Sequence, residues 1–191
     1  MFVKSRAAVL AAVCFVAASC STSKTDKNAS GESADSVQHA AAMTPVQRGA
    51  YLATVMGCHD CHTPGAFYGA PDMSRALSGS ELGWRGPWGV SYPANLTPDS
   101  TGLASWTDEE ILMALQNGRS KDGSPVAPPM PWPDFAHLTH DDALALVAYL
   151  RSIPPVHHVN RPSVLPDGKA SGAIITIPPA PSWDKPQKPA S

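Results

Sequence analysis

Apolar residues recur at helical spacing in three separate stretches of the chain, and the first begins at Thr44-Pro45-Val46-Gln47. There Thr is a favourable helix cap, Pro suits the first helical position, and Gln completes a capping box. The pattern predicts a helix from Thr44 to about Met56, ended by Gly57. One face of this helix carries Val46, Gly49, Ala50, Ala53 and Met56. Its small members, Gly49 and Ala50, would let a second helix approach closely.

Two further helices are predicted in the second half of the chain. Thr107-Asp108-Glu109-Glu110 is another capping box, and the amphipathic pattern after it stops at Asn117-Gly118. The third helix is expected from Thr139 to about Ser152, ended by Pro154-Pro155. The fold class expected is therefore all-α, a domain of three or more helices at residues 44–157 with long loops. The sequence shows no internal repeat, so a second domain of the same kind is not expected.

The segments between and after these helices are rich in Pro, Gly and Trp. Loops are expected from Gly79 to Asp99 and from Arg119 to Ala136, and a Pro-rich C-terminal extension covers residues 158–191. Its one apolar stretch is Ala173 to Ile177. We expect this extension either to wrap against the domain or to extend away from it.

The N-terminus resembles an export signal. Lys4 and Arg6 precede an apolar stretch from Ala7 to Ala18 and then small residues before Cys20. Residues 1–19 are interpreted as a lipoprotein-type signal peptide, Cys20 as the lipidated residue, and residues 20–43 as a flexible tether. Ordinary signal cleavage, leaving a soluble periplasmic protein, and an uncleaved anchor are the alternatives. Each interpretation places the domain outside the cytoplasm, and the first places it on the periplasmic side of a bacterial membrane.

The charge balance bears on possible partners. The formal net charge is -2, from 14 basic and 16 acidic residues. Two of the basic residues, Lys4 and Arg6, lie in the signal segment, and the others are scattered along the chain. This argues against a nucleic-acid partner.

The motif with the clearest chemistry is Cys58-His59-Asp60-Cys61-His62, a CxxCH sequence. Two thiols at this spacing can reach the two vinyl groups of one haem as thioethers, and the following His62 is then placed beneath the iron as an axial ligand. His59 is interpreted as an exposed spacer. The Thr63-Pro64-Gly65 turn is expected to present a carbonyl to the other nitrogen of His62.

Cysteine counting separates haem from two other uses of a CxxC pair. The chain has four cysteines, and Cys14 and Cys20 fall in the signal segment. A zinc site would need a second pair of ligands. A redox CxxC usually follows a strand, whereas this one follows a predicted helix. One covalently bound haem c is therefore predicted.

A second axial ligand must come from elsewhere, and Met130 is the residue predicted. It lies in Pro128-Pro129-Met130-Pro131, a stiff and extended setting that would hold a thioether in place. Met56 and Met113 lie on predicted helices and are expected in the core. Met73 is the other methionine candidate. The remaining alternatives are an open iron site or a histidine, which could be His137, His140, His157, His158 or His39 in the tether.

Several aromatic residues and one arginine lie in the two loops. Two interpretations of them remain open. They could contact the haem or its propionates, or they could pack in the core of a small domain. These residues are Trp84, Arg85, Trp88, Tyr92 and Trp132.

The segment from Thr44 to Pro155 resembles class I c-type cytochromes. It is most similar to the cytochrome c subunits of membrane-bound alcohol and sugar-acid dehydrogenases, through CHDCH, NLTPD with TG, WTDEE and LTHDDALALVAYLRSIPP. The resemblance implies that the first and last helices cross near the haem. It also implies that Cys58, Cys61, His62 and Met130 hold the haem. Those subunits typically have three haem domains, whereas this chain has one.

The sequence thus predicts a monohaem electron carrier that is not itself an enzyme. Its expected partners are a dehydrogenase donor and an oxidase or other cytochrome acceptor, with the membrane reached through lipidated Cys20. A haem enzyme or gas sensor with an open or displaceable sixth iron site is the alternative.

Overall fold

The structure is a computed structural model, and it describes residues 43–179. The predicted signal segment, lipidated Cys20 and nearly all of the tether lie outside the described residues. Five helices are present in the described part: α2 (Pro45–Val55), α3 (Cys58–His62), α4 (Asp108–Asn117), α5 (Trp132–Phe135) and α6 (His140–Ser152). Two short 3₁₀ helices, η1 (Ala66–Tyr68) and η2 (Met73–Arg75), follow α3. The strands are β1 (Gly83–Gly86), β2 (Gly89–Ser91) and β3 (Ile174–Thr176).

The three predicted helices are confirmed as α2, α4 and α6, and local capping explains their limits. The Thr44 hydroxyl accepts from the Gln47 backbone N–H, and the Gln47 side chain accepts from the Thr44 backbone N–H at 2.9 Å. The Thr107 and Glu110 side chains form the same reciprocal pair at the start of α4. Gly118 ends α4 in a left-handed conformation, with φ at 62°, which glycine adopts without steric cost.

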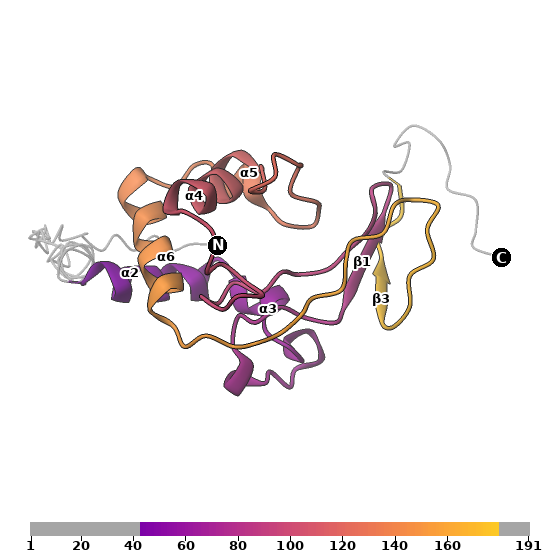
Figure 1. Cartoon of the computed structure of the whole chain (residues 1–191), viewed down its shortest axis with the longest axis horizontal. Helices are drawn as coiled ribbons and strands as arrows, with labels where there is room; N and C mark the ends of the chain where they lie inside the picture. Colours follow the sequence, from indigo (N-terminus) through magenta and orange to yellow (C-terminus); the bar gives the residue numbers. More distant parts are fainter. Residues whose placement is uncertain (1–42, 180–191) are drawn as a thin grey trace, which may run out of the picture. The chain divides into compact units, whose positions relative to one another are not determined.

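Helices α2 and α6 cross closely, and Gly49 is the reason (Figure 1). A Cβ atom at Gly49 would clash with the backbone carbonyl of Ala145 and press on Tyr149. The backbones can therefore meet only because this position has no side chain. Around the crossing, Leu52, Ala53 and Leu146 are buried. The expectation that the first and last helices cross is confirmed.

Replacing Gly49 by alanine is expected to lower the free energy of unfolding of the haem-loaded protein by about 2 kcal/mol or more, because the added methyl has no room. The sign of this change distinguishes a close crossing from an open position, because replacing Gly by Ala in an exposed helix interior usually stabilises a protein by about 1 kcal/mol. Chemical denaturation followed by circular dichroism measures it. Val55→Ala, at a 58% exposed position of the same helix, is the matched control and should change stability by about 0.5 kcal/mol at most. A stabilised Gly49→Ala protein would contradict the crossing.

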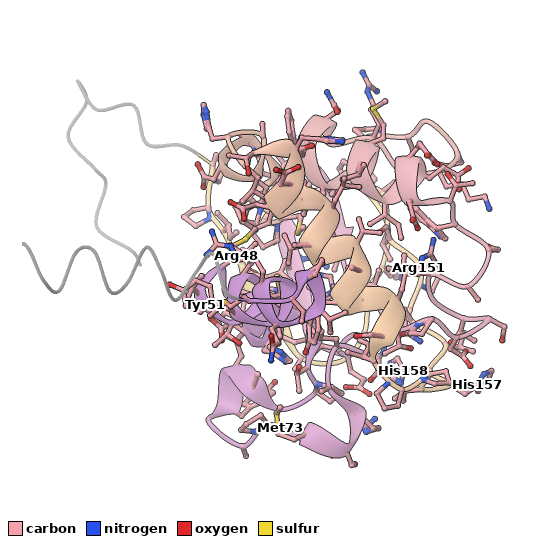
Figure 2. The ribbon with its side chains drawn as sticks, turned by 90° about the vertical axis from the view of Figure 1, so that its left-hand side faces the viewer. Arg48, Tyr51, Met73, Arg151, His157 and His158 are labelled. Atoms are coloured by element: carbon pink, nitrogen blue, oxygen red, sulfur yellow. The ribbon has the colours of Figure 1, made fainter. Side chains whose placement is uncertain are left out.

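A second core cluster lies beside the first and shares α6 with it. Leu103, Ile111 and Val147 are buried together. Arg151, on the last turn of α6, donates to the backbone carbonyls of Leu103 and Trp106 and so fixes the loop before α4 (Figure 2). Helix α6 thus joins α2 on one side to α4 on the other.

The all-α expectation needs a correction, because the described residues also contain a three-stranded sheet in the order β2-β1-β3. Strand β1 pairs antiparallel with β2, with Trp84 opposite Ser91 and Gly86 opposite Gly89. Gly89 has a φ of 104°, so the tight turn between the strands depends on glycine. The strands are too short for a periodic pattern to reveal them.

The third strand belongs to the C-terminal extension. Ile174 and Ile175 pair with Gly83 and Trp84 in a parallel register, within the apolar stretch noted in the sequence. Ten residues before β3, in the same extension, Val164 exchanges two backbone hydrogen bonds with Val90, each of 2.8 Å. The described part of the extension therefore wraps against the domain.

Among residues 43–179, no helix has the length and apolar character needed to cross a membrane.

Candidate haem-binding site

The CxxCH segment forms a helix of its own, α3. Gly57 has a φ of 69°, and this left-handed residue breaks the chain away from α2 immediately before Cys58. One helical turn separates Cys58 from Cys61, so both thiols lie on the same side of α3. Both are partly buried, and they form no disulfide. Cys58 packs against the core cluster at the α2–α6 crossing.

The environment of the two thiols does not suit the other uses of a CxxC pair. Burial raises the pKa of Cys58 to about 11, and burial also raises the pKa of Cys61. Catalytic redox pairs have a lowered thiol pKa, because the thiolate is the reactive form. Within the described range, no three His, Cys, Asp or Glu side chains are grouped so as to hold a metal ion. The zinc alternative gains no support there.

His62 is held in a defined orientation. The residue is 9% exposed, and its Nδ1 lies 2.8 Å from the backbone carbonyl of Ala94. A carbonyl can only accept, so Nδ1 must carry the proton and donate it, which leaves the lone pair on Nε2. Burial lowers the pKa of the His62 imidazole and favours this neutral form. His62 has the tautomer that an Nε2 metal ligand needs.

The carbonyl that fixes His62 is not the one expected from the sequence. The carbonyls of the turn after His62 are used locally: that of Thr63 accepts from Ala66 N–H and that of Pro64 accepts from Asp72 N–H. The expectation for this turn was therefore wrong, and Ala94 supplies the bond from 32 residues away. His59 also differs from expectation, because it is only partly exposed and its Nδ1 lies 3.1 Å from the Thr63 hydroxyl.

The loop with Met130 is tied to the same stretch of chain that holds His62. The buried Ser91 hydroxyl donates to the carbonyl of Pro128 at 2.6 Å, two residues before Met130. Ser91 is three residues before Ala94, a separation of at most about 11 Å along an extended chain. One short segment thus contacts both His62 and the Met130 loop.

The structure separates Met130 from the other methionines. Met130 is partly buried, whereas Met73, on η2, is 59% exposed (Figure 2). Met56 packs against the core as expected. Met113 is 48% exposed on α4, so its expected core position was wrong. Its place on a helix was predicted correctly, but its side chain is not buried.

Of the histidine candidates, His39 lies outside the described residues, and the other four lie at the surface or beside acidic groups. His137 and His140 are exposed near the start of α6. His157 lies 3.3 Å from Asp99 and is largely exposed (Figure 2). His158 lies 3.9 Å from Glu81. None of these contacts favours a histidine over Met130.

The loop aromatics have different surroundings from one another. Trp84 is buried on β1 and meets Phe67 edge to face, with ring centroids 4.9 Å apart. The Tyr92 hydroxyl donates to the carbonyl of Ser171, so it contacts the C-terminal extension. The Trp132 ring packs on Gly118. Arg85, on β1, is partly exposed.

The groups that would hold a haem are present in the structure. Two buried side-chain groups of the described residues, the indole N–H of Trp88 and the hydroxyl of Ser78, have no hydrogen-bond partner. The two thiols of α3 are free, and the His62 imidazole keeps its Nε2 unprotonated. This donor set fits a covalently attached haem.

Comparison with known proteins also indicates a haem-binding chain. The model of the cytochrome c family matches residues 46–154. The cytochrome c subunit of alcohol dehydrogenase (quinone) from Gluconobacter oxydans is 37% identical over 118 residues, which are 61% of this chain and 23% of that protein. The gluconate 2-dehydrogenase cytochrome c subunit of Pantoea cypripedii is 33% identical over 123 residues, 63% of this chain and 26% of that protein.

The fructose dehydrogenase cytochrome subunit of Gluconobacter japonicus is 32% identical over 111 residues, which are 56% of this chain and 22% of that protein. The chain spans about a quarter of the length of these curated relatives. The matched region runs from the second residue of α2 through α6 and includes the whole CxxCH segment. The chain therefore belongs to the cytochrome c family and binds haem c covalently, with Cys58 and Cys61 forming the CxxCH pair and His62 following them.

Proposed function

We propose that this protein is a monohaem electron carrier with His62 and Met130 as the two axial ligands of the iron. The observation that carries the proposal is the segment Ser91–Ala94. It donates to the Met130 loop at one end and accepts from His62 at the other. Such a segment would hold an imidazole and a thioether on either side of one haem. The single CxxCH sequence in the chain supports one haem.

The roles of the residues follow from their chemistry. Cys58 and Cys61 would anchor the haem through thioethers, and the Nε2 atom of His62 would ligate the iron while Nδ1 stays bonded to Ala94. The thioether of Met130 would fill the sixth position, which raises the reduction potential. When bound, haem supplies a one-electron iron couple. With both axial positions filled by the protein, no substrate would be transformed at the site, so we propose an electron-transfer protein rather than an enzyme.

The relatives indicate the kind of partner. Those described above are named as cytochrome subunits of alcohol, gluconate and fructose dehydrogenases. We propose that this chain accepts electrons from a dehydrogenase and passes them to an oxidase or another cytochrome, as an independent carrier or an accessory subunit. The lipoprotein-like sequence around Cys20 supports a lipid anchor on the periplasmic side of a bacterial membrane.

The experiment that tests this function is a potentiometric titration of the purified haem protein, combined with exposure of the reduced form to carbon monoxide. An electron carrier should show one reversible one-electron transition and no spectral response to carbon monoxide. A high-spin protein that binds carbon monoxide at once would instead favour the alternative, a haem enzyme or gas sensor with an open sixth site.

The Ser91 hydroxyl gives a further expected result. Ser91→Ala removes the donor to the Pro128 carbonyl and loosens the Met130 loop. A hydrogen bond of this kind is worth about 1 kcal/mol, so imidazole should displace the Met130 sulfur about five-fold more readily. Imidazole titration of the oxidised protein measures this affinity. Ser100→Ala, which removes an exposed hydroxyl bonded to Asp99, is the control and should leave it unchanged. Equal affinities in all three proteins would argue against the Ser91 tether.

A further inference from the structure

Asn160 lies in the C-terminal extension, beyond the residues that the family model matches. Its side-chain amide bonds to the chain on both sides of Ala94. Oδ1 accepts from the backbone N–H of Asn95 at 2.7 Å, and Nδ2 donates to the carbonyl of Pro93 at 2.8 Å. A peptide N–H can only donate and a carbonyl can only accept, so these two bonds also fix which way the amide is turned.

The bond to Asn95 acts directly on the carbonyl that meets His62. The N–H of Asn95 and the C=O of Ala94 are the two ends of one planar peptide group. Asn160 therefore holds one end of the peptide whose other end accepts from His62 Nδ1 at 2.8 Å. Hydrogen bonds linked through one peptide also polarise each other, so the acceptor strength of the Ala94 carbonyl depends on Asn160.

The surrounding structure keeps Asn160 in place. On one side, the backbone N–H of His158 donates to the Thr101 hydroxyl at 3.0 Å. On the other, Val164 is paired with Val90. The amide itself occupies the space beside Gly79, where a Cβ atom would clash with it. The N–H of Gly79 in turn donates to the backbone carbonyl of His62 at 2.8 Å.

We propose that Asn160 is a positioning residue for the axial histidine: it fixes the Ala94 carbonyl against His62 Nδ1 and thereby lowers the reduction potential of the haem. The proposal rests on the proposed function, in which His62 ligates the iron. A firm bond from Nδ1 to a carbonyl makes the imidazole a stronger electron donor, and a stronger donor favours the oxidised iron. The C-terminal extension thus contributes to the tuning of the site.

The test replaces Asn160 by alanine and by leucine in the full haem-loaded chain. Both variants are neutral, as Asn is, so no charge is added or removed near the haem. At an ambient potential equal to the wild-type midpoint, the ratio of reduced to oxidised protein should rise about three-fold in each, which is about 28 mV at 59 mV per tenfold. The matched control is Val159→Ala, a neighbouring and 73% exposed position, which should keep the wild-type midpoint.

A second readout follows the bond itself. In nuclear magnetic resonance spectra of the reduced protein, the His62 Nδ1 proton should shift and exchange faster in both Asn160 variants. In the unmodified protein, the Asn95 N–H should exchange more slowly than the N–H of Val159, which tests the proposal even where a variant fails to fold.

The outcomes separate this inference from the proposed function. Wild-type midpoints and an unchanged Nδ1 resonance in both variants would overturn the role of Asn160 while leaving the electron carrier intact. Opposite shifts in the alanine and leucine variants would also overturn it, because the effect would then follow side-chain size. A wild-type protein without a reversible one-electron transition would instead overturn the proposed function.

Discussion

Replacing both Cys58 and Cys61 by serine is expected to abolish covalent attachment of the haem. A serine hydroxyl has nearly the same size as a thiol but does not form the thioether to a haem vinyl group. The two thiols lie one turn apart on α3 and are free, so both are available for this bond. Haem staining after denaturing electrophoresis should detect the wild-type chain and not the double variant. Each single variant should keep its haem through one remaining thioether.

The matched control for this prediction is His59→Ala. His59 lies between the two cysteines, and its imidazole is bonded to the Thr63 hydroxyl rather than left free. Its removal keeps the CxxCH spacing, so the haem stain should persist. Staining of the double serine variant at the wild-type level would contradict the assignment of these thiols.

Replacing Met130 by alanine is expected to open the sixth coordination position. Alanine offers no ligand atom, and the Ser91 bond to Pro128 would keep the loop from supplying another residue as ligand. The reduced variant should bind carbon monoxide, which the wild type should not. Its reduction potential should fall, because a thioether ligand stabilises the reduced iron. Optical titration with carbon monoxide and potentiometry measure the two effects.

Met73→Ala and Met113→Ala are the controls for this experiment. Both side chains are about half exposed and lie on other elements, η2 and α4. They should leave carbon monoxide binding and the potential at wild-type values. Opening of the site by Met73→Ala, with Met130→Ala unchanged, would move the sixth ligand to η2.

The features predicted well from the sequence are those set by neighbouring residues. The two capping boxes determined where α2 and α4 begin, because each cap and its partner are three residues apart. Gly49 signalled a close helix crossing because only a residue without a side chain tolerates it. The chemistry of the CxxCH segment could also be predicted locally, because the two thiols and the imidazole lie within five consecutive residues.

The features that were missed depend on residues far apart in the sequence. The carbonyl that orients His62 comes from Ala94, and no local pattern distinguishes that carbonyl from the one at Pro64. Strand β3 pairs with β1 although Ile174 lies 91 residues after its partner Gly83, and each strand has too few residues to show alternation. Asn160 lies in a Pro-rich extension, and no motif marks it. Its role follows only from the two bonds that flank Ala94.

The most direct test of the central claim, axial ligation by both His62 and Met130, is the absorption spectrum of the oxidised wild-type protein. Methionine sulfur on oxidised haem iron produces a weak far-red absorption band that histidine ligation and open sites lack. We expect this band in the wild-type protein and its loss in Met130→Ala, with the haem still covalently bound. A high-spin oxidised spectrum without the band in the wild type would contradict the account.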